Sequence, residues 1–198
     1  EVQKVTERTP KQQKKKFEVQ NVSERPQEGQ RWFRQQNAYD CGPMAVLNAL
    51  SSIGFEGGPQ NVQQVRDAIA LRRVREGMGT QNQRGEDISS TGWMIATDLW
   101  KYLAHDLHIP AEIVTRNPDD IEQIKRELST NSHKFYIMTS GPHFRVLKGT
   151  DNPEVFQLLD SFNDGPQSIS RERAFELIDA REQNEADRTR YSAGVLAG

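Results

Sequence analysis

The densest run of apolar residues in the chain covers residues 45–53 and predicts a helix with almost no polar side. Such a helix has no face suited to water, so we expect it to be buried inside a domain. Cys41 stands just before this run, at the end of a polar, turn-forming stretch at 35–40. Pro43 suits the first turn of a helix, because the N–H that proline lacks would have no helical partner there. The pattern therefore predicts a buried helix with Cys41 at its N-terminus.

Three short apolar runs in the second half of the chain predict three consecutive strands. They cover residues 134–139, 143–149 and 154–160, and turn-forming Gly, Pro and Asn residues separate them. Strands joined by such short turns form an antiparallel meander, in which the start of one strand lies beside the end of the next. His143 begins the second strand and Asp160 ends the third. We therefore expect these two side chains to be neighbours.

Helical spacing of apolar residues predicts four further helices, at residues 60–74, 93–103, 117–129 and 170–182. We expect residues 89–91 to cap the second of these helices and its tryptophans to lie in the core. The polar stretch at 76–91 is long for a loop in a compact domain, and such loops are often functional, so we expect it to border a substrate cleft. Together with a short strand at 113–114, these elements indicate an α+β fold.

Polar segments flank the region that carries these elements. Residues 1–30 are rich in Glu, Gln, Lys and Arg, and we interpret them as an N-terminal extension with one short strand at 17–22. Residues 31–182 form the expected folded domain, since 198 residues suffice for one domain with a substantial core. We interpret residues 183–198 as a polar C-terminal tail.

Net charge, apolar runs and cysteine count argue against several classes of partner and location. A net charge of −2 gives no field that would favour nucleic acid or a membrane surface, so neither is expected as a partner. No apolar run approaches the roughly 20 residues of a membrane-spanning helix, and no signal peptide is visible. The single cysteine excludes an internal disulfide, which favours a reducing compartment such as the cytoplasm.

The position of Cys41 suggests a nucleophile. Unpaired backbone N–H groups and the positive end of the helix dipole favour a thiolate at a helix N-terminus. A cysteine nucleophile needs a base, and the base needs a group that orients it. His143 is the expected base and Asp160 the group that holds its tautomer. His133, at the far end of the preceding strand, and Asp164, in a turn, are the weaker rivals.

A metal site is not expected. His105 and His108 lie three residues apart, but the chain has one cysteine and no second ligand pair nearby. We interpret both as surface histidines at a helix end, and we expect no cofactor.

The motifs around these residues resemble the papain-like cysteine peptidases. Gln35, Asp40-Cys41-Gly42, His143-Phe144 and Asp160-Ser161 occur in that family's order. The pattern is most similar to the bacteriocin-processing C39-type peptidases, which carry Gln six residues before the Cys. It also resembles the deubiquitinating Josephin domains. The SUMO-specific proteases share the Asp-Cys-Gly triplet but place His and Asp before the Cys. The resemblance implies a papain-like fold, with Gln35, or Gln36 as its substitute, in the oxyanion hole.

The implied activity is thiol-dependent hydrolysis of a protein or peptide substrate. A ubiquitin-like isopeptidase and a polyprotein-processing protease both fit, and the glycine-ended C-terminus resembles the self-cleavage product of some viral leader proteases. Two alternatives stay open. The same triad on the same fold can deamidate glutamine or transfer acyl groups, and an inactive binding module would keep Cys41 for packing alone.

Overall fold

The computed structural model describes residues 30–115, 117–140, 142–180 and 193–198 of the chain. In chain order the elements are α1 (Cys41–Ser52), α2 (Val62–Arg75), α3 (Ala96–Lys101), the π-helical turn η1 (Tyr102–Asp106), β1 (Ala111–Val114), α4 (Pro118–Thr130), β2 (Phe135–Ser140), β3 (His143–Lys148), β4 (Val155–Leu159), β5 (Gln167–Ser170), α5 (Arg171–Asp179) and β6 (Gly194–Ala197). The expected N-terminal extension, including its strand at 17–22, lies outside these residues except for Gln30. No helix in the described part of the chain is long and apolar enough to cross a membrane.

One antiparallel sheet organises the described residues. Its strand order is β1-β6-β2-β3-β4-β5, and every neighbouring pair is antiparallel. The predicted meander is confirmed, because β2, β3 and β4 are consecutive in the chain and adjacent in the sheet. The mixed α and β composition with an antiparallel sheet confirms the predicted fold class at that level.

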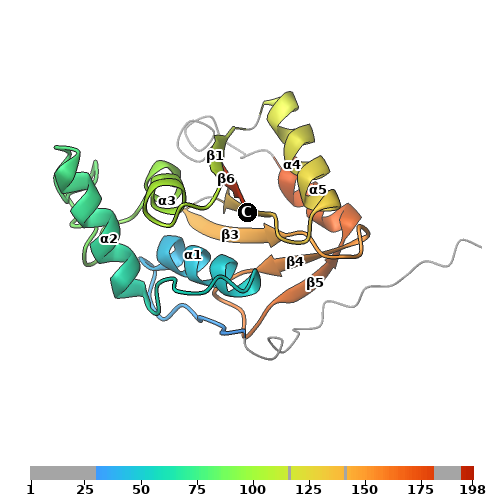
Figure 1. The fold of residues 1–198 in the computed structure, drawn as a ribbon, viewed down its shortest axis with the longest axis horizontal. Coiled ribbons are helices and arrows are strands. Elements are labelled where there is room, and N and C mark those ends of the chain that lie inside the picture. The colour runs from blue at the N-terminus through green and yellow to red at the C-terminus, as the bar shows by residue number, and fades with distance from the viewer. Residues whose placement is uncertain (1–29, 116, 141, 181–192) are drawn as a thin grey trace, which may run out of the picture.

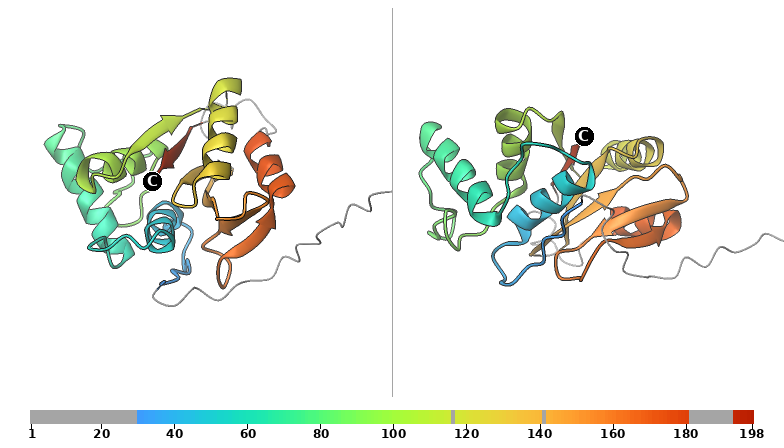
Figure 2. Two further views of the ribbon diagram at one scale, coloured as in Figure 1. Left: turned by 45° about the vertical axis from the view of Figure 1, so that its right-hand side comes forward. Right: turned by 60° about the horizontal axis from the view of Figure 1, so that its bottom comes forward.

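Helices cover both faces of the sheet. Successive side chains of a strand point to opposite faces, so Phe135 and Ile137 pack with α1 and its neighbours while Tyr136 and Met138 pack with α4 and α5. Figures 1 and 2 show α1, α2 and α3 on one side of the sheet and α4 and α5 on the other.

The helix α1 is the centre of the first layer. The predicted buried helix is confirmed: Val46, Leu47 and Ala49 are at most 1% exposed. It packs on β3 in the middle of the sheet. Burial on all sides fixes the position of its N-terminus against the sheet, and that N-terminus carries Cys41.

The end of the chain is part of the sheet, which corrects the tail predicted for residues 183–198. Residues 194–197 form β6, hydrogen-bonded between β1 and β2, with Val195 fully buried. Gly194 permits this insertion, because a Cβ there would lie 2.7 Å from the carbonyl oxygen of Ile137. Four small or apolar residues after a polar stretch give too short a pattern to predict a strand.

The predicted helix at 93–103 begins later than expected. In the structure α3 starts at Ala96, where Asp98 accepts a hydrogen bond from the N–H of Ile95. Gly92 packs against the backbone of Asp87, and its N–H donates to the Asp87 carbonyl oxygen at 2.7 Å. This contact keeps the backbone before Ala96 out of the helix. Trp93 therefore lies in an extended segment rather than on a helix.

Candidate active site

The first turn of α1 presents Cys41 to the start of β3. The Met44 N–H donates to the carbonyl oxygen of Asp40 at 2.8 Å, which closes the first helical turn around the cysteine. Cys41 is 2% exposed, and its Sγ lies 3.8 Å from the carbonyl oxygen of Pro142. The only cysteine of the sequence thus lies beside the residue that precedes His143.

The imidazole of His143 lies between Cys41 and Asp160. Its Nε2 is 2.9 Å from Oδ1 of Asp160, and the Cys41 side chain lies close enough to raise the pKa of the ring. Since Nε2 contacts the carboxylate, Nδ1 is the ring nitrogen that remains for the thiol. The structure therefore brings together the three side chains selected from the sequence.

The rival residues lie elsewhere. Asp164 is exposed and forms an ion pair with Arg34 at 2.8 Å. His133 is exposed and precedes β2, at the strand end opposite to Ser140. Gly198 also lies at that end, packed against His133. These groups do not contact the imidazole of His143.

Asp160 is held by more than the histidine. Its Oδ1 accepts the N–H of Phe162 at 3.1 Å, and its Oδ2 lies 2.9 Å from Nε of Arg145 in an ion pair. Burial opposes ionisation of the carboxyl. The hydrogen bonds from His143 and Phe162, with the positive charges of His143 and Arg145, outweigh burial and hold the Asp160 pKa below its ordinary value. Asp160 is therefore a carboxylate at neutral pH.

The pKa of His143 is raised to about 9. Burial by itself favours the neutral ring, but hydrogen bonds to Asp160 and Cys41, and the charges of these two groups, favour the protonated form more strongly. The imidazole is therefore protonated at neutral pH and loses its proton as the pH rises through about 9.

This shift gives a testable prediction. The ring NMR signals of His143, assigned by their absence from His143→Gln, are expected to titrate with a midpoint near 9. In Asp160→Asn the midpoint should fall, because the variant removes the negative charge that stabilises the imidazolium. A wild-type midpoint at or below 6.5, the ordinary value, would contradict the geometry.

Phe162 stacks on the imidazole. The ring centroids of Phe162 and His143 are 4.5 Å apart with an interplanar angle of 30°. The phenyl ring covers one face of the histidine while remaining 55% exposed itself. It thereby limits the access of water to the hydrogen bond between His143 and Asp160, whose strength depends on low local polarity.

Hydrogen bonds to Ser161 and Asn37 hold Gln35 in a fixed position. Its backbone N–H donates to the Ser161 carbonyl oxygen at 2.8 Å, and its side-chain Oε1 accepts the Ser161 hydroxyl at 2.8 Å. Its Nε2 donates to the carbonyl oxygen of Asn37. Gln35 is 7% exposed, whereas Gln36 is exposed to solvent. The structure therefore ties Gln35, and not Gln36, to the segment that carries Asp160.

A buried arginine fixes the loop that precedes Cys41. Arg66 of α2 is 1% exposed, and its Nε and Nη2 bind Oδ1 of Asp40 at 3.2 and 2.9 Å. The same guanidinium donates to the carbonyl oxygens of Tyr39, Ile88 and Gly92. Arg66 thus joins the loop before α1 to the loop before α3.

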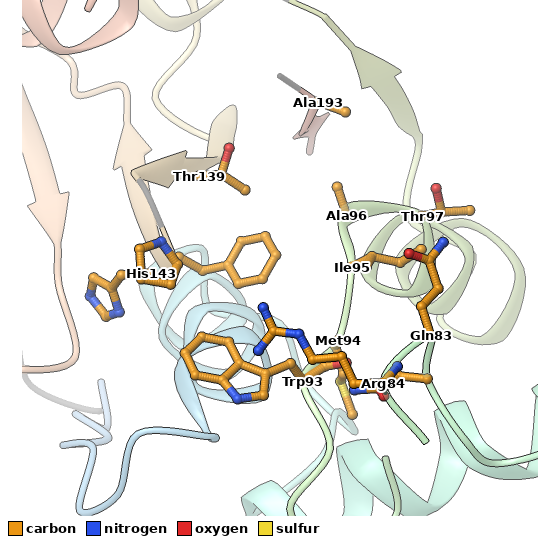
Figure 3. A pocket seen from close by; sticks show the side chains of 13 residues that line it. Gln83, Arg84, Trp93, Met94, Ile95, Ala96, Thr97, Thr139, His143 and Ala193 are labelled. Atoms are coloured by element: carbon orange, nitrogen blue, oxygen red, sulfur yellow. Dashed lines mark hydrogen bonds between the residues drawn. The ribbon is translucent and has the colours of Figure 1, made fainter. Parts of the chain in front are cut away.

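A pocket of about 590 Å³ opens beside His143. Its wall comes from three parts of the chain: the loop before α3 with the first residues of that helix, the facing ends of β2 and β3, and the residue before β6. The lining residues are Asn82, Gln83, Arg84, Trp93, Met94, Ile95, Ala96, Thr97, Thr139, Pro142, His143, Phe144 and Ala193. Figure 3 shows these side chains around the cavity. Asn82, Gln83 and Arg84 belong to the long loop at 76–91, so this loop borders a cavity beside His143; that substrate binds in the cavity stays a prediction.

The histidines at 105 and 108 are exposed, as expected for surface residues. His105 contacts the ring of Trp100, with centroids 5.6 Å apart. Within the described ranges no three His, Cys, Asp or Glu side chains gather so as to hold a metal ion.

The sequence did not reveal three residues that hold Cys41, His143 and Asp160 or their loops in place: Arg145, Phe162 and Arg66. Arg145 follows His143 by two positions and so shares its face of β3, a signal that was available from the sequence. Phe162 follows Asp160 by two positions but lies after the strand, where no periodicity applies. Arg66 joins α2 to the loops before α1 and α3, and no local sequence pattern predicts a contact between three such distant segments.

Comparison with known proteins gives little beyond this geometry. No protein-family model and no curated protein sequence matches the chain. Among solved structures, the chain is similar to the Pseudomonas avirulence protein AvrPphB with a TM-score of 0.37 and 12% sequence identity. The match covers 79% of this chain and 88% of that one. A likeness at this TM-score assigns neither a fold family nor an activity, so the function has to be inferred from the site itself.

Proposed function

We propose that the protein is a cysteine peptidase of papain-like fold, with Cys41 as nucleophile, His143 as acid and base, and Asp160 as the group that orients His143. One observation carries the proposal: a single imidazole is hydrogen-bonded to a buried carboxylate and interacts with the only thiol of the sequence, which lies beside the residue before that histidine. Nucleophile, base and orienting group in hydrogen-bonded series are the arrangement that acyl transfer through a covalent intermediate requires.

The proposed reaction has two halves. The pair reacts as thiolate and imidazolium: the proton of Cys41 resides on His143, and the sulfur attacks the carbonyl carbon of the substrate. The tetrahedral intermediate collapses to a thioester as the C–N bond breaks, and His143 gives its proton to the leaving amine. Water, deprotonated by His143, then attacks the thioester, releases the carboxylic acid and regenerates the thiolate beside the protonated imidazole.

The oxyanion of each intermediate would be stabilised by the Cys41 backbone N–H and by Gln35. A glutamine amide has two N–H donors, and Asn37 accepts one of them. The second is the donor proposed for the oxyanion. Because the amide is held by Ser161 and Asn37, it needs no reorganisation during the reaction.

Gln35→Ala is therefore expected to lower kcat by about 10²–10³-fold, the effect typical of losing one oxyanion donor. The matched control is Gln36→Ala, the adjacent and exposed glutamine, which should leave kcat within about twofold of wild type. Steady-state rates on one peptide substrate measure both. Equal losses in the two variants would rule out the assigned role of Gln35.

The test of the activity is digestion of a peptide library, followed by mass spectrometry, with wild type and Cys41→Ala in parallel. Cleaved products that need Cys41 support a peptidase. A gain of about one dalton without cleavage would instead show glutamine deamidation, and amine adducts would show acyl transfer. Electrophilic probes built on ubiquitin and its relatives test the isopeptidase form of the proposal.

A further inference from the structure

The pocket beside His143 has an unbalanced charge. Its walls include the apolar side chains Trp93, Met94 and Phe144. The only ionisable groups among its lining residues are Arg84 and His143, and the lining contains no carboxylate. Because His143 is protonated at neutral pH, both groups are positive. A ligand that fills this pocket meets apolar surface and positive charge.

Arg84 stands on a loop whose conformation is fixed. The side-chain Oδ1 of Asn82 accepts the N–H groups of Arg84 and Glu86 at 2.9 and 3.0 Å. The Nδ2 of the same side chain donates to the carbonyl oxygen of Trp93 at 3.2 Å, and a β-bridge between Gln81 and Asp87 closes the loop. The backbone of Arg84 is thus held against the extended segment that forms the pocket wall.

The side chain of Arg84 is directed into the pocket. Figure 3 shows it extending from its loop toward the His143 end of the cavity. The carboxylates of its own loop are engaged elsewhere, Glu86 with Asn82 and Asp87 with Ser89. Among the described residues no hydrogen bond or ion pair involves the Arg84 guanidinium. It is therefore available to a ligand.

We infer that Arg84 is a specificity-determining residue that binds a carboxylate of the substrate, so that peptides with Glu or Asp close to the scissile bond are preferred. This inference rests on the proposed peptidase function. Guanidinium and carboxylate match in charge and in planar geometry, and such hydrogen bonds are stronger than neutral ones. Trp93 and Met94 offer apolar contact to the methylene part of a glutamate side chain.

The experiment compares matched peptides that carry Glu, Gln or Lys at each of three positions on either side of the scissile bond. At one position wild type should cleave the Glu peptide about five- to tenfold faster in kcat/KM than the Gln peptide. Arg84→Ala should bring this ratio to about 1. Arg84→Glu should cleave the Lys peptide with a higher kcat/KM than the Glu peptide. Arg126→Glu, an exposed arginine of α4 with the same change of charge, should keep the wild-type ratio.

A binding measurement separates this inference from the peptidase proposal. Fluorescein-labelled peptide mixtures with a fixed Glu or Gln are titrated into Cys41→Ala, with and without Arg84→Glu, and anisotropy is recorded. Tighter binding of the Glu mixtures that disappears with Arg84→Glu supports the carboxylate site even if wild type cleaves nothing. Equal affinity for Glu and Gln mixtures, or a preference that survives Arg84→Glu, overturns it whatever the activity.

Discussion

Replacing Cys41 by alanine is expected to abolish peptide hydrolysis, with a loss in kcat of about 10⁵-fold or more. The thiol supplies the only covalent step of the proposed reaction, and no other cysteine exists to replace it. Cys41→Ser should fail almost as completely, because a hydroxyl in the same place is a far weaker nucleophile when paired with a histidine arranged for a thiol. Steady-state rates on a peptide that wild type cleaves provide the measurement.

The control for these variants is stability. Cys41→Ser changes one buried atom, so its melting temperature should stay close to that of wild type. Loss of activity at unchanged stability assigns the effect to chemistry. Activity retained in Cys41→Ala would exclude the proposed mechanism, and it would leave packing as the role of the cysteine.

Replacing Arg66 by methionine is expected to lower the free energy of unfolding by about 3–5 kcal/mol, the cost of breaking a buried ion pair. The variant leaves Asp40 without its cation, although the Asp40 side chain is only 14% exposed. It also leaves the carbonyl oxygens of Ile88 and Gly92 without the hydrogen bonds that Arg66 donates. Unsatisfied buried acceptors are costly because water cannot replace the lost donor.

Thermal unfolding checks this prediction, with an expected fall in Tm of about 6–20 °C for a chain of this size. Arg126→Met is the matched control, because Arg126 is exposed on α4 and should change Tm very little. Arg66→Lys should lie between wild type and Arg66→Met, since it keeps the charge but cannot make five hydrogen bonds. A Tm for Arg66→Met within 2 °C of the Arg126→Met control would contradict the assigned role.

The sequence predicted α1 and the meander because their patterns are strong and local. A helix buried on all sides appears as a continuous apolar run, and strands between turn residues can be recognised one by one. The contact between His143 and Asp160 followed from the strand order alone, because neighbouring antiparallel strands fix which ends meet. The placement of Cys41 beside His143 did not follow from any local pattern, and it became visible only with α1 packed on β3.

The two features that the sequence did not predict, β6 and the start of α3, have a common physical cause. The strand β6 is short and owes its stability to β1 and β2 on either side, which no local window contains. The start of α3 is set by the contact of Gly92 with Asp87, and this contact turned Trp93 from an expected core residue into a wall of the pocket. At both places tertiary contacts, and not the local sequence pattern, set the secondary structure.

The central claim is that the fold makes Cys41 a reactive nucleophile through His143, and alkylation of that thiol tests it most directly. Because the sequence has one cysteine, intact mass after timed exposure to iodoacetamide reports on Cys41 alone. At pH 7 the folded protein is predicted to react faster than the same chain unfolded in urea, and His143→Gln is predicted to remove this advantage. Slower labelling of the folded wild type, unchanged by His143→Gln, would show a cysteine that is merely buried and would contradict the account.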